Sequence, residues 1–161
     1  MKRKILLVSA WACVLVCMTM IFNFSGQDGE KSSETSKKVV ETVLGVVMKK
    51  EDITPPVVAK YQFPIRKAAH FGIYMLLGFS LSCAYLITFN KNGILPYGCA
   101  LVTSVLYAVS DEIHQNFTLN RGPSARDILI DSSGAIAGII IYALFILSVS
   151  KLKKREQTPV I

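Results

Sequence analysis

Ionisable residues interrupt three otherwise apolar stretches of this chain, and their types and spacing suit several kinds of chemistry. The first stretch carries Arg66, His70 and Tyr74 at four-residue steps, with Lys67 beside them. Such steps place side chains on one face of a helix, one turn apart. This face offers a guanidinium that can hold an anion and an imidazole that can exchange protons near neutral pH. From beside the face, Lys67 can reach toward phosphate head groups.

The second stretch combines carboxylates with the other histidine. On a helix, Tyr107 and Asp111 share a face with His114 or Gln115, whereas Glu112 points about 100° away. A histidine and a carboxylate on one face can act together in proton transfer.

The third stretch contains Arg121, Arg126, Asp127 and Asp131 in that order. Asp131 follows Asp127 by one helical turn, which places it about 6 Å further along the helix axis. A carboxylate inside an apolar segment is costly and is expected to face other helices. We therefore expect Asp131 to face the interior and to have a partner, with Arg66, Arg126 or His70 as candidates.

An anion pocket is the most economical interpretation of these groups. Arginine binds phosphate and carboxylate groups through its forked guanidinium. Arg66, Arg121 and Arg126 supply three such groups, which nearby carboxylates would orient. The expected ligand-binding residues are Arg66, Lys67, Tyr74, Glu112, Gln115, Arg121, Arg126 and Asp131.

Acid–base catalysis is the alternative, with His70 or His114 as acid or base and Asp111 or Asp127 orienting it. We expect no cofactor and no metal, because a zinc motif such as His-Glu-x-x-His is missing and the four cysteines lie inside apolar windows. In a third interpretation, the same groups satisfy one another and only tie helix ends together.

Four apolar windows must position these residues. The chain is 52% hydrophobic and only 18% charged, whereas soluble proteins carry about 25% charged residues. We predict transmembrane helices at about 5–24, 66–89, 93–113 and 126–149, each near the length that crosses a hydrocarbon core of about 30 Å. The predicted fold is all-α, a polytopic membrane bundle of four helices that forms a single domain over residues 1–161.

The net charge of +7 has a one-sided distribution. The excess of cations lies in the N-terminal segment, at Lys91 and in the C-terminal segment, which four crossings place on one side of the membrane. Lys and Arg mark the cytoplasmic side. We therefore predict that both termini are cytoplasmic, that the three polar stretches meet in the outer leaflet, and that no nucleic acid is bound.

Residues 25–64 form the one long segment outside the predicted spans. Apolar residues recur there at three- and four-residue steps from Val39 to Val47, which predicts an amphipathic helix on the outer surface or over the mouth of the bundle. We expect Pro55-Pro56 to end this helix and Pro64 to restart the chain before the second span.

The fourth predicted span carries small residues from Gly134 to Gly138. Small residues four apart let two helices approach closely within a membrane. We expect another helix to pack against this stripe.

Several of these residues, taken in order, resemble the VanZ family of small multi-pass bacterial membrane proteins. The resemblance spans about residues 1–149 and implies a protein of the bacterial cell membrane. The family is named for a member that lowers susceptibility to the glycopeptide teicoplanin. The matching motifs are Phe24-Ser25-x-Gln27, Arg66-Lys67-x-x-His70-Phe71-x-x-Tyr74-x-x-x-Gly78, Ser110-Asp111-Glu112-x-His114-Gln115-x-Phe117, Arg121, and Arg126-Asp127-x-x-x-Asp131-x-x-Gly134-x-x-x-Gly138.

Two functions of different classes follow. The first is a polar pocket in the outer leaflet that binds an anionic envelope ligand: a membrane lipid, a lipid-linked wall precursor or the glycopeptide itself. The resemblance implies that such binding would reduce glycopeptide susceptibility. The second is a membrane enzyme that acts on a lipid-linked or cell-wall substrate through histidine and aspartate.

Overall fold

The computed structural model describes residues 1–26, 29–90, 93–117 and 124–156, and the side chains of all of these except 29–32 and 154–156. The elements are α1 (Lys2–Ser25), α2 (Gly29–Val47), the short 3₁₀ helix η1 (Lys50–Asp52), α3 (Pro55–Phe89), α4 (Ile94–Asn116) and α5 (Ala125–Glu156). The described residues contain no β-strand. The predicted all-α class is therefore confirmed.

Four of these helices, α1, α3, α4 and α5, are long and apolar enough to cross a membrane. Large apolar side chains such as Val8, Leu106 and Leu129 are exposed on them. In water such a surface would be unfavourable, whereas lipid chains accept it, and a helix satisfies its own backbone hydrogen bonds there. The architecture is the expected polytopic bundle.

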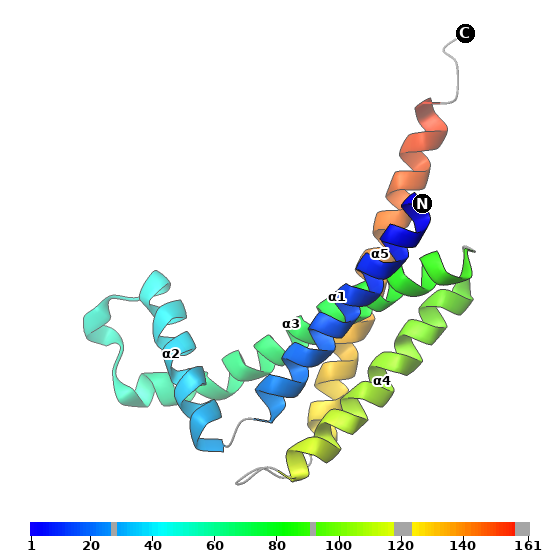
Figure 1. The fold of residues 1–161 in the computed structure, drawn as a ribbon. Coiled ribbons are helices and arrows are strands. Elements are labelled where there is room, and N and C mark those ends of the chain that lie inside the picture. Colours follow the sequence, from blue (N-terminus) through cyan, green and yellow to red (C-terminus); the bar gives the residue numbers. More distant parts are fainter. Residues whose placement is uncertain (27–28, 91–92, 118–123, 157–161) are drawn as a thin grey trace.

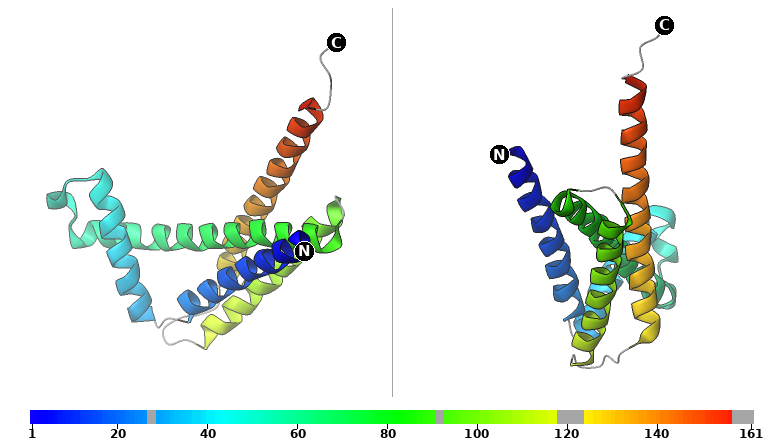
Figure 2. Two further views of the ribbon diagram at one scale, coloured as in Figure 1. Left: turned by 45° about the horizontal axis from the view of Figure 1, so that its top comes forward. Right: turned by 90° about the vertical axis from the view of Figure 1, so that its right-hand side faces the viewer.

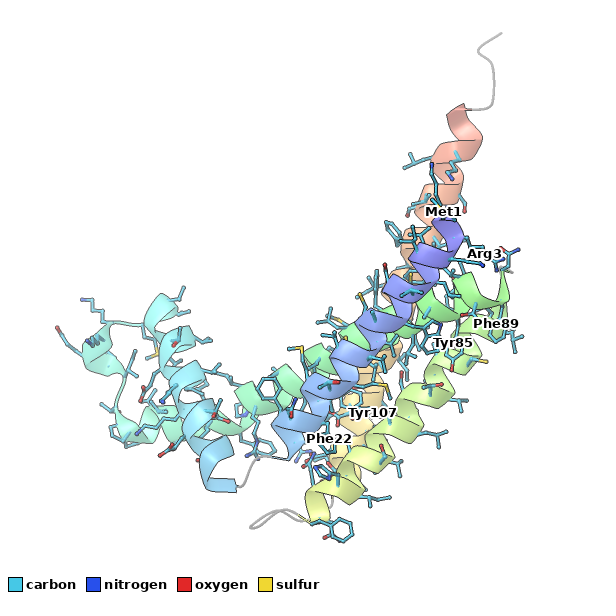
Figure 3. All side chains as sticks on the ribbon, in the orientation of Figure 1. Met1, Arg3, Phe22, Tyr85, Phe89 and Tyr107 are labelled. Atoms are coloured by element: carbon cyan, nitrogen blue, oxygen red, sulfur yellow. The ribbon has the colours of Figure 1, made fainter. Side chains whose placement is uncertain are left out.

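The bundle has two chemically different ends (Figures 1 and 2). At one end lie the start of α1, the end of α3, the start of α4 and the end of α5. We call this the terminal end. At the opposite end, which we call the polar end, α1 and α4 finish and α5 begins. At the terminal end, Arg3 Nη2 donates to the carbonyl oxygen of Ile87 at 3.0 Å, and Trp11 Nε1 donates to Thr88 Oγ1 at 3.2 Å (Figure 3).

Backbone contact between α3 and α5 sets how these two helices cross. A Cβ atom built on Gly134 or Gly138 would overlap the carbonyl oxygen of Phe71 or Met75 on α3, and one built on Gly78 would overlap that of Ala135 on α5. Glycine on both helices permits this approach, because any side chain would separate them. The prediction that a helix packs against the small-residue stripe is confirmed.

The prediction for the prolines is wrong, because Pro55-Pro56 and Pro64 all lie within α3. The pair occupies the first helical positions, where the missing N–H groups have no helical acceptor in any case. Pro64 sits inside the helix between Val58 and Ile65, and both of these pack against the buried face of α2. Packing on each side of Pro64 offsets the backbone hydrogen bond that proline cannot make.

The expected amphipathic helix in the first loop is α2, which packs on the first part of α3. Val40 and Leu44 are buried against α3, whereas Val39, Val43 and Val46 are exposed. Gln62 of α3 also donates to the Ser33 carbonyl oxygen at 2.7 Å. Together α2 and the start of α3 form an arm that projects from the bundle (Figure 1).

Candidate functional site

Polar side chains from four helices meet inside the polar end. Most of these side chains are buried, and apolar side chains pack around them. They come from the end of α1, the first half of α3, the end of α4 and the start of α5. We call this set the polar cluster: Ser25, His70, Tyr74, Asp111, Glu112, Gln115 and Asp131.

Asp111 is held by two donors from different helices. Ser25 Oγ at the end of α1 donates to Asp111 Oδ2 at 2.9 Å, and Gln115 Nε2, one turn along α4, donates to the same oxygen at 3.0 Å. All three residues are buried. The sequence interpretation did not count Ser25 among the site residues. Its position, where the first apolar window gives way to polar residues, was the available signal.

Asp131 lies opposite His70. The residue is 2% exposed, and its Oδ1 atom is 3.9 Å from His70 Nδ1. Within the described part of the chain, its second oxygen, Oδ2, has no hydrogen-bond partner. Of the three partners proposed from the sequence, the structure therefore selects His70, because the close α3–α5 contact brings this face of α3 against α5.

Tyr74 is fully buried one turn after His70 on α3. No described residue forms a hydrogen bond with its hydroxyl, although the hydroxyl lies within electrostatic range of Asp111 and Asp131. The Tyr74 ring packs 6.4 Å from that of Tyr107, whose own hydroxyl donates to the Met18 carbonyl oxygen at 2.6 Å. The neighbouring phenol of Tyr107 thus ties α4 to α1.

Glu112 faces the beginning of α5. Its Oε2 atom accepts the backbone N–H of Ser124 at 2.8 Å, so a side chain of α4 satisfies one of the free N–H groups at the start of α5. The other oxygen, Oε1, is buried without a partner. Glu112 therefore positions the start of α5. It can do so because its side chain points about 100° away from that of Asp111 on α4.

Lys67 and Asp127 form an ion pair between α3 and α5. Both side chains are mostly buried, at 15% and 19% exposure. Asp127 thus holds the ammonium group of Lys67 in this structure, and the suggestion that Lys67 reaches toward phosphate head groups stays a prediction. Asp127 accordingly lies beside a lysine and not beside a histidine.

The remaining predicted site residues are spread over the polar end. The His114 ring stacks on Phe22 of α1 at 4.3 Å, and Figure 3 places Phe22 near the end of α1. Arg126 is exposed on α5. Arg121 lies outside the described residues. The pocket of three arginines therefore stays a prediction.

Arg66 and His70 instead line a cavity of about 230 Å³ between α1, α2 and α3. His70 therefore belongs both to the cavity wall and to the polar cluster. The other lining residues are mainly apolar: Ile21, Phe24, Thr35, Ser36, Val39, Ile65, Ala69 and Ile73.

The VanZ/LLP1 family model matches residues 10–146, a segment that reaches from α1 into α5 and includes the whole polar cluster. The chain belongs to the VanZ/LLP1 family. The resemblance noted in the sequence is therefore confirmed. Comparison with curated proteins and with solved structures gave no match.

The polar residues at the polar end of this VanZ-family membrane protein form three local arrangements. The polar cluster gathers carboxylates around His70 and can hold a proton or a cation. The Lys67–Asp127 ion pair joins α3 to α5. The cavity wall places the guanidinium of Arg66 next to apolar side chains, an arrangement that suits a molecule with an anionic head and an apolar body.

Proposed function

We propose that this VanZ-family protein binds an anionic amphiphile of the bacterial envelope in the cavity between α1, α2 and α3. A phospholipid or a lipid-linked wall precursor has the required chemistry. The observation that carries the proposal is the cavity wall itself, which is apolar except at Arg66, His70 and two hydroxyl residues. An acyl or prenyl chain would pack on the apolar side chains, and Arg66 would bind the phosphate.

Charge distribution supports a place for this cavity in the outer leaflet. In the sequence, cations exceed acids near both termini and at Lys91, between α3 and α4. The start of α1, the end of α3 and the described end of α5 all lie at the terminal end. The positive-inside rule then assigns the terminal end to the cytoplasm and the polar end to the outside. A single cysteine replacing Asn116, in a variant without the four native cysteines, should react with a membrane-impermeant maleimide in intact cells; protection there, with labelling after lysis, would reverse the assignment.

Binding of an envelope lipid offers a physical route to reduced glycopeptide susceptibility, the trait for which the family is named. Glycopeptides act at the outer face of the cell membrane, where lipid-linked wall precursors are displayed. A protein that holds such a precursor, or the lipids around it, changes what the antibiotic can reach. We propose this link for the present protein as a consequence of ligand binding at the polar end.

The binding proposal can be tested in lipid nanodiscs with a photoactivatable phosphatidylglycerol as the probe. Arg66→Gln should lower cross-linking to peptides of α1, α2 and α3, and Ala69→Trp should lower it by filling the cavity. Lys60→Gln is the matched control, because it removes one exposed cation from the same helix away from the cavity. Equal cross-linking in all four proteins, or no preference over a photoactivatable phosphatidylcholine, would reject the proposal.

One observation favours the enzymatic alternative, namely that His70 lies on the cavity wall and 3.9 Å from a buried carboxylate. In that case His70 would act as acid or base on a lipid-linked substrate, with Asp131 orienting the imidazole. Mass spectrometry of envelope lipids and wall precursors should then reveal a product that cells expressing His70→Gln at equal abundance do not make. Identical lipid profiles would leave binding as the function.

A further inference from the structure

Three residues of the polar cluster, each from a different helix, place possible metal ligands around one point. Single ligand atoms of His70 on α3, Asp111 on α4 and Asp131 on α5 all lie within 4.8 Å of one another. We propose that these residues bind a divalent metal ion of the Zn²⁺ or Mn²⁺ type. The sequence predicted no metal because it lacks a local motif, whereas this set is assembled only when three helices pack.

Unsatisfied oxygen atoms point to an ion at this place. Asp131 is 2% exposed, and neither its Oδ2 atom nor the hydroxyl of the fully buried Tyr74 has a hydrogen-bond partner among the described residues. Buried polar atoms in proteins nearly always have partners, so an exception calls for an explanation such as an ion. A metal would take up Asp131 Oδ2, and Tyr74, one turn from His70, would face the ion or its bound water.

Charge and support around the three side chains agree with a divalent ion. A neutral imidazole and two carboxylates carry a formal charge of −2, which equals in magnitude the charge of a divalent ion. Ser25 and Gln115 already donate to Asp111 Oδ2, at 2.9 and 3.0 Å. Such hydrogen bonds behind a ligating carboxylate fix its orientation in metal sites.

The ligand atoms indicate which ion fits. One imidazole nitrogen with carboxylate oxygens suits Zn²⁺ or Mn²⁺, whereas Ca²⁺ and Mg²⁺ take oxygen ligands. Zinc bonds of about 2.0–2.2 Å place neighbouring ligands roughly 3.3 Å apart. The three ligand atoms, all within 4.8 Å of one another, would reach this separation through side-chain rotations that draw them together.

The test uses the full chain, purified in detergent, stripped of metal with a chelator and titrated with Zn²⁺ and Mn²⁺ alone. No lipid is added, so the result does not depend on the proposed cavity ligand. Wild type should bind one ion per chain. His70→Gln and Asp131→Asn should weaken binding by more than about 10-fold, since even changes to groups behind the ligands have effects of that size.

Matched controls separate ligation from a general disturbance of the polar end. His114→Gln and Asp52→Asn (Asp52 is exposed in η1) remove the same chemical groups outside the set of three, and should leave metal affinity nearly unchanged. Zn²⁺ should raise the Tm of wild type and of both controls, while the Tm of His70→Gln stays constant. If wild type binds no stoichiometric Zn²⁺ or Mn²⁺, binds only Mg²⁺ or Ca²⁺, or binds as tightly as His70→Gln and Asp131→Asn, the proposal is overturned.

Discussion

At the terminal end of the bundle, polar groups are paired through simple contacts between α1, α3 and α4, whereas the polar end leaves buried oxygens unpaired. Trp11 packs edge-on against Tyr85 at 5.3 Å, and Tyr85 stacks on Phe89 at 5.7 Å and shares a 2.9 Å hydrogen bond with Thr103. Among the described residues, the unpartnered oxygens of Tyr74, Glu112 and Asp131 all belong to the polar end.

From this difference we infer that the terminal end serves stability and the polar end serves function. A region under selection for stability alone would exchange unpaired carboxylates for apolar groups, as the interior of the bundle does around Leu77 and Leu81. Buried ionisable groups inside a membrane bundle are typical of functional sites. We therefore interpret the terminal end as a structural junction and the polar end as the site. The changes described next test this comparison, from the largest expected effect to the smallest.

Gly138→Val should have the largest effect, because it breaks the contact that brings α5 to α3. The new side chain would overlap the Met75 carbonyl oxygen, which the α3 backbone cannot move away. We expect a loss of stability of about 3 kcal/mol or more, the upper range for overpacking, seen as a low yield of monodisperse protein and a reduced Tm. Gly98→Val is the control, since a Cβ at Gly98 meets nothing within 4 Å. Equal stability of the two variants would show that the α3–α5 contact is not needed.

Breaking the Lys67–Asp127 ion pair should have the next largest effect. Lys67→Met leaves a mostly buried carboxylate unpaired, so a loss of about 1–2 kcal/mol is expected, less than for a fully buried pair. The double variant Lys67→Met/Asp127→Asn should recover part of this loss. A double-mutant cycle in thermal unfolding measures the coupling, and a value near zero would mean that the two residues act independently.

Asp131→Asn should keep or raise the stability of the metal-free protein, by up to about 1 kcal/mol, because it removes a charge buried at membrane depth. In cells, the same substitution should abolish the reduction in glycopeptide susceptibility that we propose for this protein, at an unchanged level of the protein in membranes. The Tm measured with a chelator present, together with protein level in membranes, separates the two effects. A large loss of stability would show that Asp131 is structural, and would weaken the contrast between the two ends.

Tyr85→Phe should have the smallest effect. It removes the hydrogen bond to Thr103 at the terminal end, which is worth about 0.5–1.5 kcal/mol. The glycopeptide susceptibility of the cells should not change, because no described group at that end belongs to the polar cluster or the cavity. If Tyr85→Phe abolished the reduction in glycopeptide susceptibility while the Tm stayed the same, functional residues would lie at both ends.

The sequence predicted much of this arrangement, and packing decided the rest. The lengths of the apolar windows gave the four spans, and Gly134 and Gly138 gave the close helix contact. The continuation of α3 through Pro64 could not be predicted, because it depends on the packing of α2 around that position.

The same limit applies to the site. The sequence identified the ionisable residues, but their pairing depends on how far each helix is rotated and shifted against its neighbour. A different rotation of α3 about its axis would give Lys67 and His70 other partners. Only the packed structure shows that Asp127 pairs with Lys67 and that Asp131 faces His70. The contribution of Ser25 also required the position of the end of α1 relative to α4.

Native mass spectrometry of the purified protein tests most directly whether the polar end serves a ligand. Wild type and Lys60→Gln, released from detergent micelles, should carry a bound anionic envelope lipid, and the variant Arg66→Gln/His70→Gln should have lost it. A wild-type protein that carries no anionic lipid, or a double variant that carries the same lipid to the same extent, would contradict the account.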